Sequence, residues 1–271
     1  MMCRVLQVSR SGYFAWAQRV ESARRQRDRE LLLQIRRVHL ESRGVYGARK
    51  VHRELLRLGE ACGRHRVARL MRQDGLKGCP KRRFRRLAST APSHPIAANL
   101  LQQDFTARRA NERWAADITF IATRQGWLYL AVVMDLYSRR IVGWAMDREV
   151  GRRLVIAALT MALGYRQPAG PLLHHSDRGP QYTSDDFREL LARHGIRCSM
   201  SGRGSCYDNA PVESFFSLLK RERIRRQTYR TREEAKADVF DYIERFYNRR
   251  RSHTYLDYLT PVEYEDRMVG T

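Results

Sequence analysis

The amino-acid sequence predicts an α/β protein in which a core with a mixed sheet, in the order β-β-β-α-β-α-β-α, follows a small all-helical domain with a helix-turn-helix. Apolar residues recur at helical spacing from residue 28 to about residue 75, whereas aromatic and β-branched residues form strand-length runs from residue 114 onward. A proline-containing segment of small residues separates the two regions and is typical of a linker. With 43% hydrophobic residues, the chain of 271 residues can bury one large domain and a smaller attachment.

The charge of the chain indicates a polyanionic partner. There are 52 Lys and Arg residues against 29 Asp and Glu residues, a formal net charge of +23. Nucleic acid fits best, because no apolar run approaches the roughly 18 residues of a transmembrane helix. The N-terminus has no continuous apolar region, so we expect a cytoplasmic protein without a signal peptide and no membrane partner. The five cysteines include no C-x-x-C pair, which argues against a disulfide framework and a zinc site.

Three short helices are expected in the first region. The last, Arg64–Gln73, follows a glycine-containing break at Gly59–Gly63, which gives helix-turn-helix proportions. Residues 64–86 hold ten basic residues and one acid. We expect basic side chains of this helix and of its tail to contact duplex DNA. These side chains are Arg64, Arg66, Arg69, Arg72, Arg82 and Arg83. The alternative is a helical bundle with a solvated basic face.

The second region begins with three predicted strands. Trp114–Ala122, Trp127–Leu136 and Arg139–Met146 are separated by gaps short enough for hairpins, which predicts an antiparallel meander. Trp114, Trp127 and Trp144 are expected in its core, and the alternative is that they form base-stacking platforms.

Helices and short strands alternate after the meander. The expected order is a helix over 152–164, a strand over 172–175, a helix over 184–194 and a strand over 196–200. A helix then begins at Asp208 or Asn209. A last helix opens with the capping box Thr231–Glu234 and carries Val239, Phe240, Ile243 and Phe246. The predicted segments are an extension over 1–27, a helix-turn-helix-like DNA-binding domain with a basic tail over 28–87, a linker over 88–103, and a core with C-terminal helices over 104–267.

Three carboxylates are candidates for metal-assisted phosphoryl transfer. Asp117 interrupts a strand that otherwise looks buried, and a lone buried carboxylate is costly unless it binds a cation. Asp177 follows a short strand in a polar loop, where sites in α/β sheets gather, and Glu213 lies in the first turns of a helix. Mg²⁺ prefers such hard oxygen ligands, and two ions can clamp the attacking and leaving oxygens. The 35 residues between Asp177 and Glu213 carry little weight alone, because chance produces about one such spacing.

Several extended motifs resemble those of one family, and they cover the chain nearly end to end. They are Cys3–Tyr13, Gly44–Gly47, Trp127–Val133 with Asp135, Ser138–Trp144, the loop at Asp177, Asp208–Phe216 and Tyr247–Arg251. With them the chain resembles the second reading frame of IS3-type insertion-sequence transposases, members of the D,D(35)E integrase superfamily.

The resemblance implies an RNase H-like core that cleaves insertion-sequence ends and transfers strands by 3'-hydroxyl attack. It implies Asp117, Asp177 and Glu213 as catalytic and metal-binding residues for Mg²⁺ or Mn²⁺, with two ions per site. Lys220, seven residues after Glu213 on the same helix face, is implied to contact DNA. Implied partners are double-stranded DNA of element ends and target, further copies in a synaptic complex, and the product of an upstream reading frame or a frameshift fusion with it. The resemblance also implies a bacterial protein that associates with the nucleoid.

The chain departs from the family pattern at four places without removing a metal ligand. The departures are Pro180, Gly202–Arg203, Tyr207 and Tyr255–Asp257. They bear on fine positioning rather than on the reaction class.

Other polar residues have competing interpretations. Asp185 and Asp186 are expected as helix N-terminal acids. For Asp135 we leave open a turn role, support of a metal ligand, or contact with the metal. His174 and His175 are expected to be structural rather than proton shuttles. The arginines that flank the two C-terminal helices are expected to contact phosphates. They are Arg221, Arg223, Arg225, Arg226, Arg249, Arg250 and Arg251.

Two other functions fit part of the pattern. An RNase H-like nuclease would hydrolyse DNA without joining it, and the helix-turn-helix speaks against this. A DNA-binding repressor would lack catalysis, and the three carboxylates in their motifs speak against that.

Overall fold

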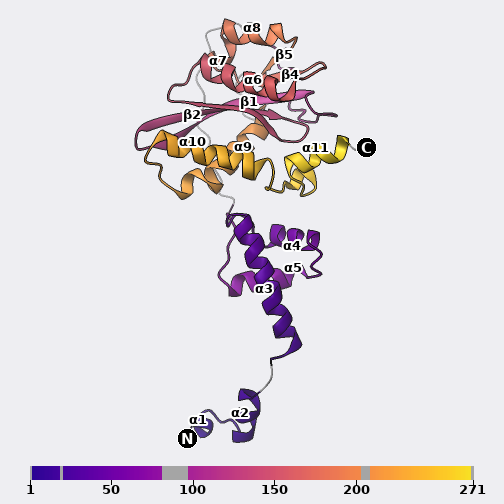
Figure 1. Cartoon of the computed structure of the whole chain (residues 1–271), viewed down its shortest axis with the longest axis vertical. Coiled ribbons are helices and arrows are strands. Elements are labelled where there is room, and N and C mark those ends of the chain that lie inside the picture. The colour runs from indigo at the N-terminus through magenta and orange to yellow at the C-terminus, as the bar shows by residue number, and fades with distance from the viewer. Residues whose placement is uncertain (1, 19–20, 81–96, 203–207, 270–271) are drawn as a thin grey trace. The chain divides into compact units, whose positions relative to one another are not determined.

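The computed structural model describes residues 2–18, 21–80, 97–202 and 208–269 (Figure 1). They belong to two compact units, Met1–Pro80 and Lys81–Thr271, and each is described by itself. The finer division at residues 28, 88 and 104 stays a prediction.

The first unit is entirely helical in its described residues. It contains α1 (Met2–Val5), α2 (Arg10–Ala17), α3 (Ala23–Glu41), α4 (Ala48–Arg57) and α5 (Arg64–Gln73). The three helices of the predicted helix-turn-helix region are thus present. α3 begins five residues earlier than expected, because Ser22 caps it by accepting a hydrogen bond from the N–H of Arg25. Ile35, Val51, Leu55 and Val67 are fully buried and join α3, α4 and α5 in one small core.

The second unit is built on a five-stranded mixed sheet. Its strands are β1 (Arg113–Thr123), β2 (Gly126–Asp135), β3 (Ile141–Asp147), β4 (Leu173–Ser176) and β5 (Arg197–Met200), in the spatial order β3-β2-β1-β4-β5. β1, β2 and β3 form the predicted antiparallel meander, whereas β4 runs parallel to β1 and β5 parallel to β4. The predicted fold class is confirmed. β3 starts two residues later than expected, because the turn extends through Arg139 with φ of 60°.

Helices cover both faces of this sheet. α6 (Arg152–Arg166), α7 (Pro180–Thr183) and α8 (Asp185–Arg193) lie on one side in Figure 1, and α9 (Ala210–Glu222) and α10 (Arg232–Phe240) lie on the other. The short helices η1 (Ile224–Arg226) and η3 (Thr254–Leu256), the π-helix η2 (Asp241–Tyr247) and α11 (Pro261–Val269) complete the unit. The capping box is as predicted, since Thr231 accepts from the N–H of Glu234.

One prediction about the core is wrong. Trp114 is fully buried among the residues that pack under α6, and Trp144 is half-buried, but Trp127 remains 49% exposed. Trp127 lies at the start of β2, beside the turn to β1, where no helix of the α6 side reaches it. Among the described residues, no helix is both long and apolar enough to cross a bilayer.

Candidate active site

The pairing of β1 with β4 relates the positions of two of the three carboxylates. Ala115 is the parallel partner of His175, and Asp117 and Asp177 each follow two residues later. β4 ends at Ser176, so Asp177 begins the loop that leaves the sheet beside the part of β1 that carries Asp117. Because side chains alternate along a strand, Asp117 lies on the face opposite to Trp114, which packs in the core under α6.

The third carboxylate is brought to this edge by the start of α9. The side-chain amide of Asn209, the N-cap residue, donates a 2.9 Å hydrogen bond to the backbone oxygen of Ala116, next to Asp117. Glu213 stands one turn further on, and its N–H donates to the oxygen of Asn209 at 3.1 Å. Asn209 thus fixes the N-terminus of the helix that carries Glu213 against the strand that carries Asp117. We expected Asn209 only as a helix cap, and its bond to β1 was not foreseen.

Asp208 holds the same helix start from the other side. Its carboxylate accepts hydrogen bonds from the N–H of Gly202 at 2.6 Å and from the amides of Asn99 at 2.9 Å and Gln103 at 3.1 Å. Asp208 is 2% exposed, so these donors replace the water that its carboxylate gives up.

The electrostatics of the neighbourhood show that these groups act on one another. Burial raises the pKa of Tyr182 well above its usual range, and the negative charges of Asp117 and Asp177 add to the effect. Desolvation lowers the pKa of Lys220, with help from Arg225, while the charge of Asp117 opposes the shift. Asp177 is exposed as a residue, but protein atoms surround its carboxyl group. The resulting desolvation raises the pKa of Asp177, and the hydrogen bond from the N–H of Gly179 opposes this rise. A cation at this edge would relieve that cost.

The described residues do not form a metal site in which the ligands already converge. Among the described residues, no three Asp, Glu, His or Cys side chains lie close enough to hold one ion. Asp117 accepts the N–H of Ile118 at 2.7 Å, and Asp177 accepts that of Gly179 at 2.9 Å. The three side chains still fit a divalent cation such as Mg²⁺, because carboxylates supply the hard oxygen ligands that this ion prefers. Convergence on an ion would require the side chains to rotate.

Asp135 does not belong to this site. It is the cross-strand partner of Trp114, so it lies on the α6 face, opposite to Asp117. Its fully buried carboxylate accepts from the guanidinium of Arg166 at 2.9 Å and from the N–H groups of Asn111 and Tyr137. The structure thus gives Asp135 a role in closing the β2–β3 turn.

The other polar candidates occupy structural positions. Asp185 and Asp186 lie in the first turn of α8, as expected. His174 is fully buried against Phe187, and burial lowers its pKa to about 3. The ring of His175 lies within hydrogen-bond distance of Ser199, at 2.9 Å, and burial lowers its pKa to about 4. Both rings are neutral at neutral pH.

The predicted DNA-contacting arginines of the helical unit fall into three groups. Arg64 and Arg72 are exposed on α5. Arg66 and Arg69 instead bind both oxygens of Asp28 on α3, at 2.6 Å and 2.7 Å, so they hold the helices together. Arg82 and Arg83 lie outside the described residues.

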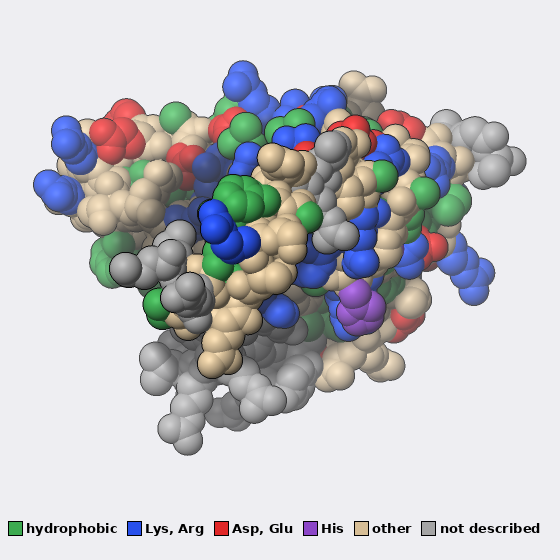
Figure 2. Space-filling view, turned by 90° about the horizontal axis from the view of Figure 1, so that it is seen from below, with side chains coloured by type: hydrophobic (Ala, Val, Ile, Leu, Met, Phe, Trp, Pro, Cys, Tyr) green, Lys and Arg blue, Asp and Glu red, His purple; other side chains and the backbone are tan. Residues whose placement is uncertain are grey.

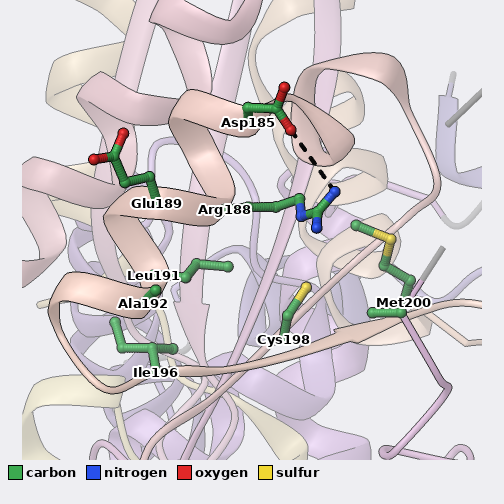
Figure 3. Close-up of a pocket in the computed structure, with 9 residues that line it drawn as sticks. Asp185, Arg188, Glu189, Leu191, Ala192, Ile196, Cys198 and Met200 are labelled. Atoms are coloured by element: carbon green, nitrogen blue, oxygen red, sulfur yellow. Dashed lines mark ion pairs between the residues drawn. The ribbon is translucent and has the colours of Figure 1, made fainter. Parts of the chain in front are cut away.

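A pocket of about 590 Å³ opens elsewhere, between α8 and β5 (Figure 3). Its lining includes Ala97, Arg188, Leu191, Ile196, Cys198 and Met200. None of the three candidate carboxylates lines it, so this pocket is separate from the proposed centre of the chemistry.

Comparisons with known proteins agree with this arrangement. Residues 107–206 and 213–269 match the family "Integrase core domain", and residues 26–84 match "HTH-like domain". The chain is 42% identical to the "Insertion element IS600 uncharacterized 31 kDa protein" of Shigella sonnei, over 98% of each chain. It is also 42% identical to "Transposase InsF for insertion sequence IS3A" of Escherichia coli (strain K12), over 99% of this chain and 94% of that protein. The chain belongs to the IS3 family of transposases.

As a member of this family, the protein is a DNA transposase, an enzyme of the polynucleotidyl transferase class that acts in DNA transposition and integration. A solved structure, the simian T-cell lymphotropic virus intasome in complex with PP2A regulatory subunit B56 gamma, matches with a TM-score of 0.50. The match covers 65% of this chain and 60% of that chain at 17% identity, which shows a shared fold.

Proposed function

We propose that the transposase cleaves DNA at the ends of its insertion sequence and joins the freed 3'-hydroxyl to a second phosphodiester, with Asp117, Asp177 and Glu213 as its catalytic carboxylates. One observation carries this assignment. β1, which carries Asp117, pairs with β4, which ends one residue before Asp177, and Asn209 ties the helix of Glu213 to the residue before Asp117. This arrangement supports a common site for the three carboxylates.

The three carboxylates would hold two divalent cations, Mg²⁺ or Mn²⁺, by rotation of their side chains. When bound, such ions activate water and neutralise charge on the phosphate oxygens. Asp177 contributes a desolvated carboxylate, whose negative charge is stabilised by a cation. The charge of Asp117 acts on the pKa of Lys220, and the ammonium group of this lysine would bind a DNA phosphate next to the reacting one.

DNA binding rests on the excess of basic side chains. On the face shown in Figure 2, Lys and Arg side chains are more abundant than Asp and Glu side chains. We assign phosphate contacts to the exposed Arg64 and Arg72, whereas Arg66 and Arg69 hold α5 on α3. The active form would be a homo-oligomer that brings two element ends together at the nucleoid, assisted by the product of an upstream reading frame.

Product analysis tests the reaction class. The full chain is incubated with Mg²⁺ and a labelled duplex that ends in the element's terminal repeat. We expect both a nicked strand and a longer product in which its 3' end is joined to other DNA. Hydrolysis without any joined product, at every protein concentration, would instead identify a nuclease.

A second candidate, a non-catalytic DNA-binding repressor, predicts the same binding but no metal-dependent product. Equal amounts of product from wild type and from Glu213→Gln would support that candidate.

A further inference from the structure

Two large aromatic side chains are exposed together beside the β1–β2 turn. Phe120 is 54% exposed and Trp127 is 49% exposed, and their ring centroids are 5.1 Å apart at an interplanar angle of 84°. Ala122 pairs with Trp127 across the hairpin, and Phe120 lies two residues before Ala122, so both rings stand on one face of the sheet. Exposed rings in contact with one another form a surface that a flat apolar group can cover.

A strongly basic connection is bonded to this hairpin. Residues 220–232, from the end of α9 to the start of α10, contain seven Lys and Arg residues. Their one acid, Glu222, is buried and pairs with Arg251 at 2.7 Å and with Arg221 at 3.5 Å. Arg223 pairs with Asp241 at 2.8 Å and with Asp238 at 3.5 Å, which corrects the expectation that it contacts a phosphate. The N–H of Arg124, in the β1–β2 turn, donates to Tyr229 at 3.0 Å, and the guanidinium of Arg232 donates to the backbone oxygen of Trp127 at 3.0 Å. The aromatic pair is thus flanked by positive charge, which complements a polyanion and disfavours a second copy of this basic chain.

The aromatic pair is connected to the helix that carries Glu213. Phe120 follows Asp117 by three residues on β1, roughly 10 Å along an extended strand, so by alternation its side chain lies on the opposite face of the sheet from that of Asp117. The ammonium nitrogen of Lys220 lies over the Phe120 ring, 4.6 Å from its centroid. Lys220 lies on α9, two turns after Glu213, so its contact with Phe120 connects the aromatic pair to the helix of the third carboxylate.

We propose that Phe120 and Trp127 form a stacking platform for an unpaired nucleobase of the DNA held at the active site, while the basic connection of residues 220–232 holds the adjoining phosphates. This inference rests on the proposed transposase function and names a feature of its substrate. A base inside a duplex presents only its edges, so contact with a ring face requires a base that has left the stack. Aromatic rings accept any such base, because every base has a π-face. The platform would therefore favour frayed or single-stranded ends irrespective of their sequence.

Binding measurements in EDTA test the platform without any cleavage. The probe is a short duplex with a single-stranded overhang that carries 2-aminopurine at its first unpaired position, and a blunt duplex of the same sequence is the reference. We expect quenched 2-aminopurine fluorescence on binding, and about tenfold tighter binding of the overhang than of the blunt duplex by wild type. Trp127→Phe should keep this preference. Trp127→Leu, which keeps the apolar bulk but has no ring, should lose it while blunt-duplex affinity stays within about twofold.

Two further variants complete the experiment. Phe120→Leu should also lose the preference, which covers the case that Trp127→Leu does not fold. Tyr255→Leu removes a ring that is 64% exposed on another element, and it should change nothing. An unchanged preference in both Trp127→Leu and Phe120→Leu would overturn the proposal. So would an equal loss of affinity for both duplexes, or a wild-type dimer in sedimentation that Trp127→Leu converts to a monomer. Because no metal is present, these outcomes are independent of whether the enzyme cleaves or joins DNA.

Discussion

The C-terminal end of α9 depends on a buried ion pair whose removal we expect to be costly. Glu222 is 2% exposed and Arg251 is 6% exposed, and the guanidinium of Arg251 donates to both carboxylate oxygens, at 2.8 Å and 2.7 Å. The hydroxyl of Tyr242 donates a third bond to Glu222, at 2.8 Å. Burial alone would lower the pKa of Arg251, but its bonds to Glu222 outweigh this and raise it. The arrangement corrects the expectation that Arg251 contacts a phosphate.

Substitution of Arg251 by Met would leave the buried carboxylate of Glu222 without its bidentate partner and with only the longer contact to Arg221, at 3.5 Å. Loss of one partner from such a pair costs about 3–5 kcal/mol, whereas replacement of the whole polar group by apolar residues is often nearly neutral. We therefore expect Arg251→Met to lower the free energy of unfolding by about 3–5 kcal/mol. The triple variant Glu222→Leu, Tyr242→Phe, Arg251→Met should recover most of that loss.

Urea unfolding at neutral pH, followed by tryptophan fluorescence, measures these differences. Arg249→Met is the matched control, because Arg249 is exposed and only two residues away, and it should change stability by less than about 0.5 kcal/mol. A loss below about 1 kcal/mol in Arg251→Met would refute the reasoning. So would a triple variant that is less stable than Arg251→Met.

Three more predictions concern other parts of the chain. Burial holds the pKa of His174 at about 3 in the folded protein, against an ordinary value of 6.5. Because the unfolded state therefore binds a proton at higher pH than the folded state, stability falls as the pH falls below about 6.5. The cost reaches about 2 kcal/mol at pH 5, and His174→Phe should remove it; identical losses between pH 7.5 and pH 5 in both proteins would count against the assignment. Gly143→Ala should destabilise the second unit by at least about 1–3 kcal/mol, because a Cβ there would stand 2.2 Å from the backbone oxygen of Ala158; an unchanged melting temperature would contradict it. Asp28→Ala should weaken the helical unit by about 1 kcal/mol, since Arg66 and Arg69 lose their shared partner; unaltered hydrogen exchange in α3 and α5 would argue otherwise.

The elements of the fold were predictable because their signals are local. Alternation of apolar residues marked the meander, and helical spacing marked α6, α8 and α9. The mixed sheet followed from the order of these elements. The last predicted helix, which carries Ile243 and Phe246, is present, but its second half is the π-helix η2, a form that local periodicity does not reveal. The helix α11 was not predicted.

Contacts between distant residues account for what the sequence did not reveal. Trp127 is a large aromatic residue of the kind that is usually buried, but its exposure depends on which part of the sheet the helices cover. The side of the sheet on which Asp135 lies follows from its register with Trp114, which no local pattern contains. Asp28, 38 residues before Arg66, could not be identified as its partner without the fold. The position of β4 beside β1, by contrast, could be anticipated, and it brings the strand of Asp117 next to the strand that precedes Asp177.

Single-turnover cleavage of a labelled element end in Mg²⁺ tests the central assignment most directly. Asp117→Asn, Asp177→Asn and Glu213→Gln should each lower the cleavage rate by roughly a thousandfold or more while duplex affinity changes little. Asp185→Asn, at an exposed acid on α8, should cleave at the wild-type rate. Near-wild-type cleavage by any of the three carboxylate variants would contradict the assignment of that residue to the active site.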